Sequence, residues 1–390
     1  MKKLSVIALV ICALMLMWIP AGAEAVKGDM DGSGKIDILD VLELLKCVTA
    51  SPTSADALKG DMDGNGKAEI TDVLTVLKSV TTSTPVEENK GMQIIPDIDL
   101  RKGIQLLSQK DHNNGNRFSV LDTHDFYGGT AQSPVWRLAQ WDSGPCLVAN
   151  RIESDATTIT DGVGRTFAYY PDEKRMKFEL DTSLYYKGKA AVSGDYWPHL
   201  LAEQNSFLTS YDLDTMQYLT CDPERLVLSL DIRLTEFSQT PINGDWARAA
   251  QFQMYFYVKG LETSDFCWFG VHFFDNRFDN TDHNIGYDGG KPDASNAMIF
   301  TIGTKYTYAN SGRTLYKNGQ PDTSGEWVHV EIDLKPYLEE MLARGKQDGY
   351  FDANSLSELY IDGMNVGWET IATFDHTMEM KNIELVSYNE

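Results

Sequence analysis

Two twelve-residue stretches, residues 29–40 and 61–72, place oxygen-bearing side chains at positions 1, 3, 5, 9 and 12 and glycine at positions 4 and 6. A hard cation such as Ca²⁺ takes about six to eight oxygen ligands, and glycine at position 6 permits the sharp turn around it. This is the calcium-loop spacing of an EF-hand, and it predicts one ion per loop. The predicted ligands are Asp29, Asp31, Ser33, the carbonyl of Lys35, Asp37 and Asp40, then Asp61, Asp63, Asn65, the carbonyl of Lys67, Glu69 and Asp72.

Each loop runs into a segment with the apolar periodicity of a helix, and the whole unit repeats after 32 residues. Single helices of this length are marginal in water. We therefore expect the two helices to pack together, with bound metal supplying much of the folding free energy. The apolar positions are Val41, Leu42, Leu44, Leu45 and Val48 in the first helix, and Val73, Leu74, Val76, Leu77 and Val80 in the second.

The repeats KGDMDGSGKIDILDVLELLKCV and KGDMDGNGKAEITDVLTVLKSV make residues 26–82 resemble the type I dockerin family. That resemblance implies a small all-α calcium-binding module, a duplicated F-hand, which docks into a cohesin module on a scaffoldin within a cellulosome. It also implies that loop positions 10 and 11 face the cohesin. These positions are Ile38 and Leu39 in the first repeat and Ile70 and Thr71 in the second. The repeats are alike at position 10 and differ at position 11, which argues against a dockerin that binds cohesin equally well through either repeat.

The N-terminus has the three parts of a secretory signal peptide. Lys2 and Lys3 precede an almost uncharged apolar stretch, and the small residues Ala21, Gly22 and Ala23 close it. The stretch is shorter than the roughly 20 residues that a membrane-spanning helix needs, and no cationic stop-transfer cluster follows. We expect cleavage after Ala23, which removes residues 1–23, or after Ala25, and we expect the mature protein to be extracellular, without a membrane anchor.

The formal net charge is -23. An acidic protein repels polyanions, so nucleic acid is excluded as a partner, whereas neutral sugars or basic partners remain compatible. The calcium loops and the acidic surface of a secreted protein both contribute to this charge. Charge alone therefore does not identify the substrate.

Residues 83–96 are rich in Thr, Ser, Pro and Glu, which indicates a linker. In residues 97–390 the apolar positions recur mostly with period two, which is typical of strands, and a longer helix is expected only around Leu338. This pattern predicts a large all-β antiparallel sandwich, and residues 358–388 are loosely similar to jelly-roll carbohydrate-binding or glycan-active domains. The strands are centred near Lys177, Leu228, Tyr255, Phe269, Ile299, Val330, Tyr360 and Leu385.

Two of these strands carry a polar and aromatic face. Residues 251–258 place Gln251, Gln253, Tyr255 and Tyr257 opposite four apolar residues, and residues 265–274 place Trp268, His272 and Phe274 opposite Cys267, Phe269, Val271 and Phe273. Aromatic rings can stack on sugar rings, and planar amides can hydrogen-bond sugar hydroxyls. We therefore predict that Tyr255, Tyr257 and Trp268 bind carbohydrate; the alternative is that they pack beneath a second layer of chain.

Two cleavage chemistries are compatible with the available side chains. Glycoside hydrolysis needs two carboxylates across the scissile bond, for which the candidates are Glu179, Glu203, Asp275 and Glu369. Elimination needs a base and a cation, for which the candidates are His199, Tyr257, His272 and Arg277. Residues 270–283 gather His272, Asp275 and Arg277 beside the aromatic face, so these three are the predicted catalytic residues; a solvated loop or a structural calcium site is the alternative.

No nucleophile elbow, zinc-ligand cluster or phosphate-binding loop is present. Cys47, Cys146, Cys221 and Cys267 remain after signal removal, and their spacing fixes no disulfide pairing. The sequence predicts a secreted subunit that docks to a cohesin and cleaves plant cell-wall polysaccharide. A non-catalytic carbohydrate-binding module and a structural or inhibitory scaffold-attached protein are the alternatives.

Overall fold

The computed structural model contains two compact units, Met1–Asn89 and Lys90–Glu390. It describes residues 27–33, 36, 38–49, 59–83, 91–109, 118–129, 133–141, 153–154, 157–210, 217–277, 284–289, 295–303 and 320–389. The predicted signal peptide, two predicted calcium ligands (Lys35 and Asp37) and Cys146 lie outside these ranges. Among the described residues, no helix has both the length and the apolar character needed to cross a membrane.

The first unit contains the two predicted helices, α2 (Ile38–Thr49) and α4 (Ile70–Ser83). Each begins at position 10 of its loop, and the two pack against each other. Their small core consists of Val41, Leu44, Val73 and Val76, flanked by the partly buried Met30, Ile36, Val48, Met62 and Ala68. Four buried apolar side chains stabilise only a marginal fold, which agrees with the expectation that metal binding contributes to folding.

The second unit is a large β-sandwich. Sheet A runs in the order β15 (Val328–Asp333), β10 (Arg225–Gln239), β17 (Phe374–Tyr388), β8 (Arg175–Asp181), β7 (Arg165–Tyr170), β6 (Thr158–Thr160) and β5 (Glu153–Ser154), with β1 (Met92–Gln93) beside β17. Sheet B runs in the order β13 (Asn284–Tyr287), β14 (Met298–Ile302), β12 (Phe266–Asp275), β11 (Ala249–Gly260), β16 (Leu359–Ile371), β9 (His199–Gln204), β4 (Trp136–Ala139), β2 (Ile104–Leu107) and β3 (Val120–His124).

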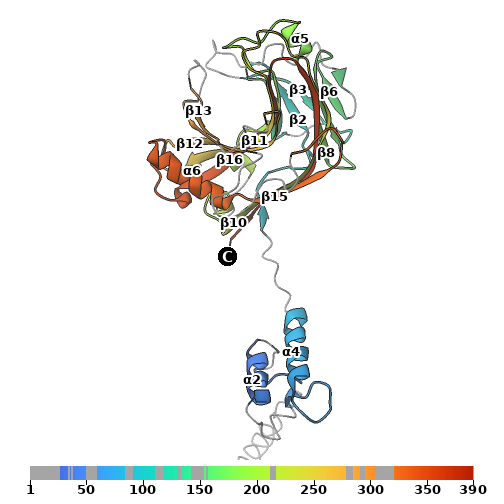
Figure 1. The fold of residues 1–390 in the computed structure, drawn as a ribbon, viewed down its shortest axis with the longest axis vertical. Coiled ribbons are helices and arrows are strands. Elements are labelled where there is room, and N and C mark those ends of the chain that lie inside the picture. The colour runs from blue at the N-terminus through green and yellow to red at the C-terminus, as the bar shows by residue number, and fades with distance from the viewer. Residues whose placement is uncertain are drawn as a thin grey trace, which may run out of the picture. The chain divides into compact units, whose positions relative to one another are not determined.

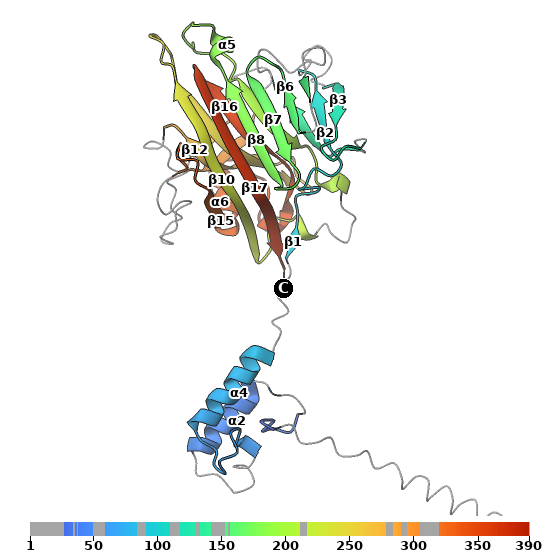
Figure 2. The ribbon, with the colours of Figure 1, turned by 90° about the vertical axis from the view of Figure 1, so that its right-hand side faces the viewer.

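Neighbouring strands are antiparallel except for the pairs β12–β14 and β2–β4. Both sheets curve, with sheet A on the outside of the curve and sheet B on the inside (Figure 1), and the long strands β10 and β17 dominate the outer sheet (Figure 2). The short helix α5 (Ser183–Tyr186) lies at one end of the sandwich. Helix α6 (Lys335–Gln347), which the sequence predicts around Leu338, packs through Tyr337, Leu338 and Met341 onto the core.

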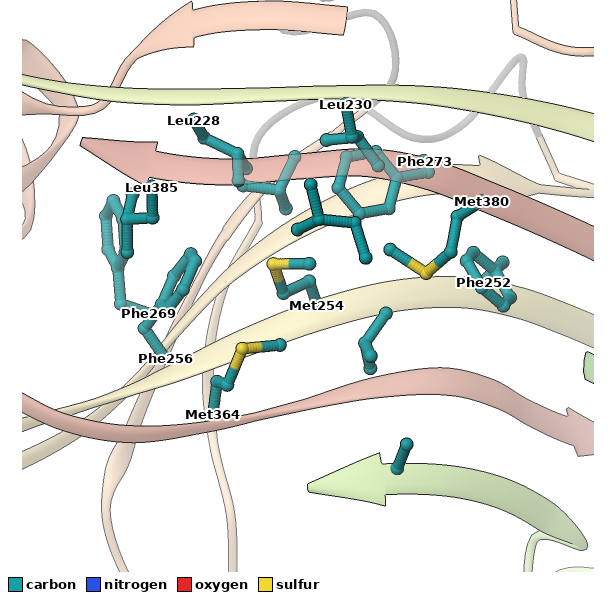
Figure 3. Close-up of a cluster of buried hydrophobic side chains, with 14 of the residues drawn as sticks. Leu228, Leu230, Phe252, Met254, Phe256, Phe269, Phe273, Met364, Met380 and Leu385 are labelled. Carbon is teal, nitrogen blue, oxygen red and sulfur yellow. The ribbon is translucent and has the colours of Figure 1, made fainter. Parts of the chain in front are cut away.

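The core lies between the sheets and follows the predicted alternation. Phe252, Met254 and Phe256 of β11 point into it, opposite Leu228 and Leu230 of β10 (Figure 3). Each of the predicted strands is present. Because one face of each strand is buried, a one-residue shift in register would expose the whole apolar set.

Two sequence-based expectations differ from the structure. Phe274, predicted on the polar face with His272, is 5% exposed and belongs to the core, because a β-bulge pairs Phe252 with Phe274 but Gln253 with His272 and so interrupts the alternation. Residues 92–96, predicted as linker, belong to the sandwich: β1 pairs with β17, and Ile94 and Ile95 are buried. A two-residue strand is too short to show a period in the sequence.

Candidate functional site

Each loop of the first unit gathers three carboxylates. Oxygen atoms of Asp29, Asp31 and Asp40 all lie within 4.8 Å of one another, and the same is true of Asp61, Asp63 and Asp72. Three carboxylates so close together repel one another unless a cation neutralises them. The all-oxygen donor set therefore fits a hard divalent cation such as Ca²⁺, in agreement with the ligands predicted for positions 1, 3 and 12.

The aspartate at position 12 also organises each loop. Asp40 is fully buried, and its Oδ1 accepts hydrogen bonds from the backbone N–H groups of Met30, at 2.6 Å, and Asp31, at 3.2 Å. Asp72 repeats this arrangement with Met62 and Asp63, at 2.8 and 3.3 Å. Asn65 at position 5 donates to both Asp63 and Glu69, so the second loop brings its position 3, 5 and 9 side chains together.

The predicted cohesin-facing residues are on the surface. Ile38 and Leu39 are each 53% exposed, Ile70 is 55% exposed, and Thr71 is exposed as well. These side chains leave the first turn of each helix and do not join the small core. Large apolar residues exposed in this way are typical of a surface that a partner covers.

In the second unit, the side chains of sheet B that point away from the core form a polar and aromatic surface, here called the inner face. Its central strands carry His199, Glu203, Gln251, Gln253, Tyr255, Tyr257, Trp268, His272, Asn365 and Glu369. The strand register aligns these residues in rows that cross the sheet perpendicular to the strands, here called rungs. One rung contains Arg137, Glu203, Asn365, Tyr255 and Gly270, and another contains His199, Glu369, Gln251 and Asp275.

Glu203 is a fully enclosed carboxylate of the inner face. It is fully buried, and Oε1 pairs with the guanidinium of Arg137. Oε2 accepts hydrogen bonds of 3.2 Å from the indole N–H of Trp141 and from the hydroxyl of Tyr257. Burial raises the pKa of Glu203, and Arg137 together with the two neutral donors opposes part of that rise.

The predicted aromatic residues gather in one cluster. Trp268 stands edge-on to Tyr257 at a centroid distance of 5.0 Å and to Tyr255 at 6.4 Å. The ring of Tyr255 covers Gly270, where a Cβ atom would collide with it, and its hydroxyl lies 3.0 Å from Oγ1 of Thr301. Tyr255 and Trp268 are partly exposed, but Tyr257 is only 5% exposed, so the first two are the more accessible to a sugar.

The structure also brings together the three predicted catalytic residues. Arg277 donates two hydrogen bonds to the buried Asp275, at 3.0 and 2.7 Å, and His272 Nδ1 lies 3.9 Å from Asp275. His272 Nε2 lies 3.3 Å from the hydroxyl of Tyr255. Burial lowers the pKa of His272 to about 4, so its imidazole is neutral near pH 7. Asp275 also bonds Gln251 and the backbone of Arg277, which makes it an organiser of this turn.

The remaining catalytic candidates lie on different sheets. Glu369 is partly exposed on the inner face, and its Oε2 accepts a 2.6 Å hydrogen bond from Gln253. His199 is buried in the same rung, and burial lowers its pKa to about 3. Glu179, by contrast, lies on sheet A, paired with Lys177 at 2.6 Å. The structure therefore retains Glu203 and Glu369 as a carboxylate pair and sets Glu179 apart.

Sequence reasoning missed Arg137 and Asn365 as components of this surface, and it did not single out Gln253 as a site residue. Gln253 did appear on the polar face of its predicted strand, so periodicity carried a signal for it. Arg137 and Asn365 come from β4 and β16, far apart in the chain, and only the register aligns them with Glu203. A local sequence pattern contains no information about such long-range pairing.

Residues 27–81 match the family model of the dockerin type I domain, so the recognition of a dockerin in this part of the chain is confirmed. Dockerin domains in general bind calcium and occur in extracellular cellulosome components that partner cohesins. The comparison with curated proteins found no match.

Solved structures similar to the chain include a family 12 xyloglucanase from Bacillus licheniformis, with 7% identity, 57% of this chain and 85% of that chain covered, and a TM-score of 0.35. An endoglucanase from Rhodothermus marinus has 9% identity, coverage of 59% and 90%, and a TM-score of 0.32. A family 11 xylanase from Neocallimastix patriciarum has 10% identity, coverage of 60% and 94%, and a TM-score of 0.33. None of these scores is high enough to assign an activity to the sandwich.

Proposed function

We propose that the chain is an exported subunit of a cellulosome-like complex, whose dockerin binds a cohesin on a scaffoldin and whose β-sandwich cleaves a neutral plant cell-wall polysaccharide. Two calcium ions, one in each loop, would hold the dockerin in its binding form. Asp29, Asp31 and Asp40, and in the second repeat Asp61, Asp63 and Asp72, would hold these ions, which neutralise the carboxylates and fix the loops. The dockerin domain at residues 27–81 supports the docking half of this proposal.

One observation carries the proposal for the sandwich. The neighbouring strands β9 and β16 place Glu203 and Glu369 on the same inner face, next to the cluster of Tyr255, Tyr257 and Trp268. Glycoside hydrolysis needs two carboxylates on either side of the scissile bond. Aromatic rings beside them would stack on the sugar units and hold the chain in place.

The register favours an inverting mechanism. Glu203 pairs with Asn365, four residues from Glu369 on the neighbouring strand, so the two glutamate Cα atoms are about 14 Å apart, given roughly 3.3 Å per residue and about 4.8 Å between strands. Retaining enzymes need carboxyl groups about 5–5.5 Å apart, whereas inverting enzymes need about 6.5–9.5 Å. The Glu369 carboxylate accepts a hydrogen bond from Gln253, which lies one rung nearer to that of Glu203 but on β11, on the other side of β16 from Glu203.

The two glutamates would then have different roles. Glu203, whose pKa burial raises, would protonate the leaving oxygen, and the more exposed Glu369 would activate the water that attacks from the opposite side. Gln253 positions the Glu369 carboxylate through its 2.6 Å hydrogen bond. Trp141 and Tyr257 fix the orientation of the Glu203 carboxylate.

The charge pattern of the inner face favours an uncharged substrate. Recognition of a uronate requires a cation that is free to meet its carboxylate. In the described part of the chain, each cationic side chain bordering the inner face is paired with an acid: Arg137 with Glu203, Lys259 with Asp362, and Arg277 with Asp275. The net charge of -23 also opposes an acidic polymer.

A second function, carbohydrate binding without cleavage, is favoured by the enclosure of Glu203. Both of its oxygens already accept hydrogen bonds, and it has no exposed surface. A proton donor must reach its substrate, so cleavage requires that Trp141 or Tyr257 move aside. A rigid inner face would bind the polymer through Tyr255 and Trp268 alone.

The test uses the full chain with calcium against xylan, xyloglucan, mixed-linkage β-glucan, mannan and polygalacturonate, recording both released reducing ends and depletion of the protein onto the polymer. Product from a neutral polymer that Glu369→Gln abolishes, and that the matched sheet A variant Glu179→Gln preserves, would support hydrolysis. Depletion without product would favour the binding module. Product from polygalacturonate alone would overturn the neutral-substrate proposal.

A further inference from the structure

Trp246 is the most exposed tryptophan in the described part of the chain, with 58% of its surface accessible. It lies in the connection between β10 and β11, at residues 240–248. Its backbone N–H donates to Ala191 O at 2.7 Å, and Asp245 accepts from the backbone N–H groups of Ala191 and Ile242 at 3.0 and 2.9 Å. The indole is thus presented on a fixed loop, and little conformational freedom would be lost when a ligand covers it.

Other apolar side chains are exposed on the adjoining connection, residues 183–198, between β8 and β9. They are Leu184, Val192 and Tyr196, which are 49%, 54% and 47% exposed. Asp195 Oδ2 accepts the backbone N–H of Val192 at 2.8 Å and so shapes the turn between them. Together with Trp246 these residues define the Trp246 patch, which spans two connections that the Trp246–Ala191 hydrogen bond joins.

Beside the patch is a small hollow lined by both apolar and polar residues. Leu184 and Tyr185 border it on the patch side, and its polar walls are Asp161, Arg165, Asp181 and Thr182. Arg165 is buried, so its position is fixed by the surrounding fold, whereas the hydroxyl of Thr182 is used in hydrogen bonds to the backbone of Ala372 and Phe374. The patch supplies an exposed indole for stacking, and the hollow supplies carboxylate and guanidinium groups that can hydrogen-bond sugar hydroxyls, which is the combination that recognition of a sugar requires.

We propose that the Trp246 patch is a second carbohydrate-binding surface, which takes a neutral polysaccharide chain separately from the inner face. Four exposed side chains are far fewer than the roughly 20–30 residues that each partner contributes to a stable protein interface, but they suffice for one or two sugar rings. The patch lies near α5, at the end of the sandwich away from the C-terminus (Figure 2). The strand β1, where the chain enters this unit, pairs with β17 at the other end.

This inference rests on the proposed function for its substrate class. The patch is also close to the inner face along the chain. Trp246 is five residues from Gln251, so no more than about 17 Å of chain separates the patch from the rung that contains Glu369. A surface at this distance would keep a long polymer near the inner face and would contribute little to the binding of a short oligosaccharide.

The test is native affinity electrophoresis of the full chain in gels containing mixed-linkage β-glucan or xyloglucan. Trp246→Ala should raise the apparent Kd for at least one polymer about three- to tenfold, because a stacking contact is lost. Trp246→Phe keeps a ring and should restore most of the binding. Leu261→Ala removes a side chain of similar exposure, 45%, at the other end of β11 and should leave binding unchanged.

The outcomes separate the two proposals. Unchanged retardation of the Trp246→Ala variant, or no retardation of the unmodified chain, would overturn the second surface even if product is released. Retardation that depends on Trp246, with no product from any polymer, would overturn the proposed cleavage and leave the second surface standing. Because Trp246 is largely exposed, its replacement should not affect folding, which circular dichroism would verify.

Discussion

The hydroxyl of Tyr257 on β11 donates a 3.2 Å hydrogen bond to Glu203 on β9, across the intervening strand β16. The ring can cross β16 because residue 363 is glycine; a Cβ there would lie 2.8 Å from Tyr257 Cδ2. Tyr255 reaches in the opposite direction, over Gly270 of β12 to Thr301 of β14. Two tyrosines on one strand therefore connect both halves of the inner face, each over a glycine.

Replacing Gly270 with alanine should push the ring of Tyr255 off the sheet. The new Cβ would collide with that ring, so we expect a loss of about 1–3 kcal/mol in the free energy of unfolding and weaker polysaccharide binding. Gly286→Ala is the matched control on β13, because its Cβ would meet only Ile299 at an ordinary 3.8 Å. Urea denaturation measures the first effect and affinity electrophoresis the second; equal stability of both variants would contradict the collision.

Replacing Arg137 with methionine should leave the buried Glu203 without its ionic partner. Loss of one member of a buried ion pair costs about 3–5 kcal/mol, and here that cost should be largest at neutral pH. Without Arg137, the pKa of Glu203 in the folded variant would lie above its pKa in the unfolded chain. The folded state therefore binds this proton at a higher pH than the unfolded state does. Protonation removes the buried charge, so the stability deficit of the variant should shrink toward acidic pH. Denaturant midpoints from pH 4 to pH 8 would show this trend.

The double variant Arg137→Met with Glu203→Gln provides the control, because it removes the uncompensated charge. It should be more stable at pH 7 than Arg137→Met alone, and its stability deficit should no longer depend on pH in this way. A constant deficit for Arg137→Met at every pH would mean that lost packing, rather than the charge of Glu203, destabilises the domain.

The buried His376 should make the sandwich sensitive to acid. It stacks on Trp368 at a centroid distance of 3.9 Å, and burial lowers its pKa from about 6.5 to about 3. The unfolded chain therefore binds this proton first, so the stabilisation is present above pH 6.5 and is lost as pH falls toward 3. At pH 4.5 this one histidine should account for lost stability on the order of 2–3 kcal/mol.

His376→Phe should accordingly lose less stability between pH 7 and pH 4.5 than the unmodified chain, although it should be weaker at pH 7 because Thr370 loses its hydrogen-bond partner. Denaturant unfolding at both pH values measures this difference. His329→Asn, at a surface histidine, serves as the control. An unchanged loss in the His376→Phe variant would show that other groups cause the acid sensitivity.

Calcium removal should unfold the dockerin and spare the sandwich. EDTA leaves the two aspartate clusters without a neutralising cation, so helical signal at 222 nm should fall while the thermal transition of the sandwich persists. The double variant Asp29→Ala and Asp61→Ala should show the same loss even with calcium present. Undiminished cohesin binding by this variant would contradict the assignment of its two aspartates as ligands.

The two exposed faces of the dockerin should contribute unequally to cohesin binding. Replacing Ile38 and Leu39 with alanine removes two large apolar side chains, whereas replacing Ile70 and Thr71 removes only one. We expect the first pair to cost about tenfold more in Kd, as measured by calorimetry with a purified cohesin. Equal small losses would show that the faces are interchangeable.

The sequence by itself determined the dockerin and most of the secondary structure. The calcium loops were readable because all predicted ligands of one loop lie within twelve consecutive residues, so their spacing in the sequence largely determines their spacing in space. The strands and α6 were readable because burial of one face produces a period in the chain. Where that local rule is interrupted, as by the bulge at Phe274 or in the two-residue strand β1, the prediction was wrong.

Only the tertiary structure decided which polar residues meet. Arg137, Glu203, Asn365 and Tyr255 come from four separate segments, and the register of β4, β9, β16 and β11 places them in one rung. It likewise separates Glu179 from Glu203, although both looked equivalent in the sequence. The physical reason is that backbone hydrogen bonds between distant strands fix these neighbours, and no periodicity within a single strand encodes its partner.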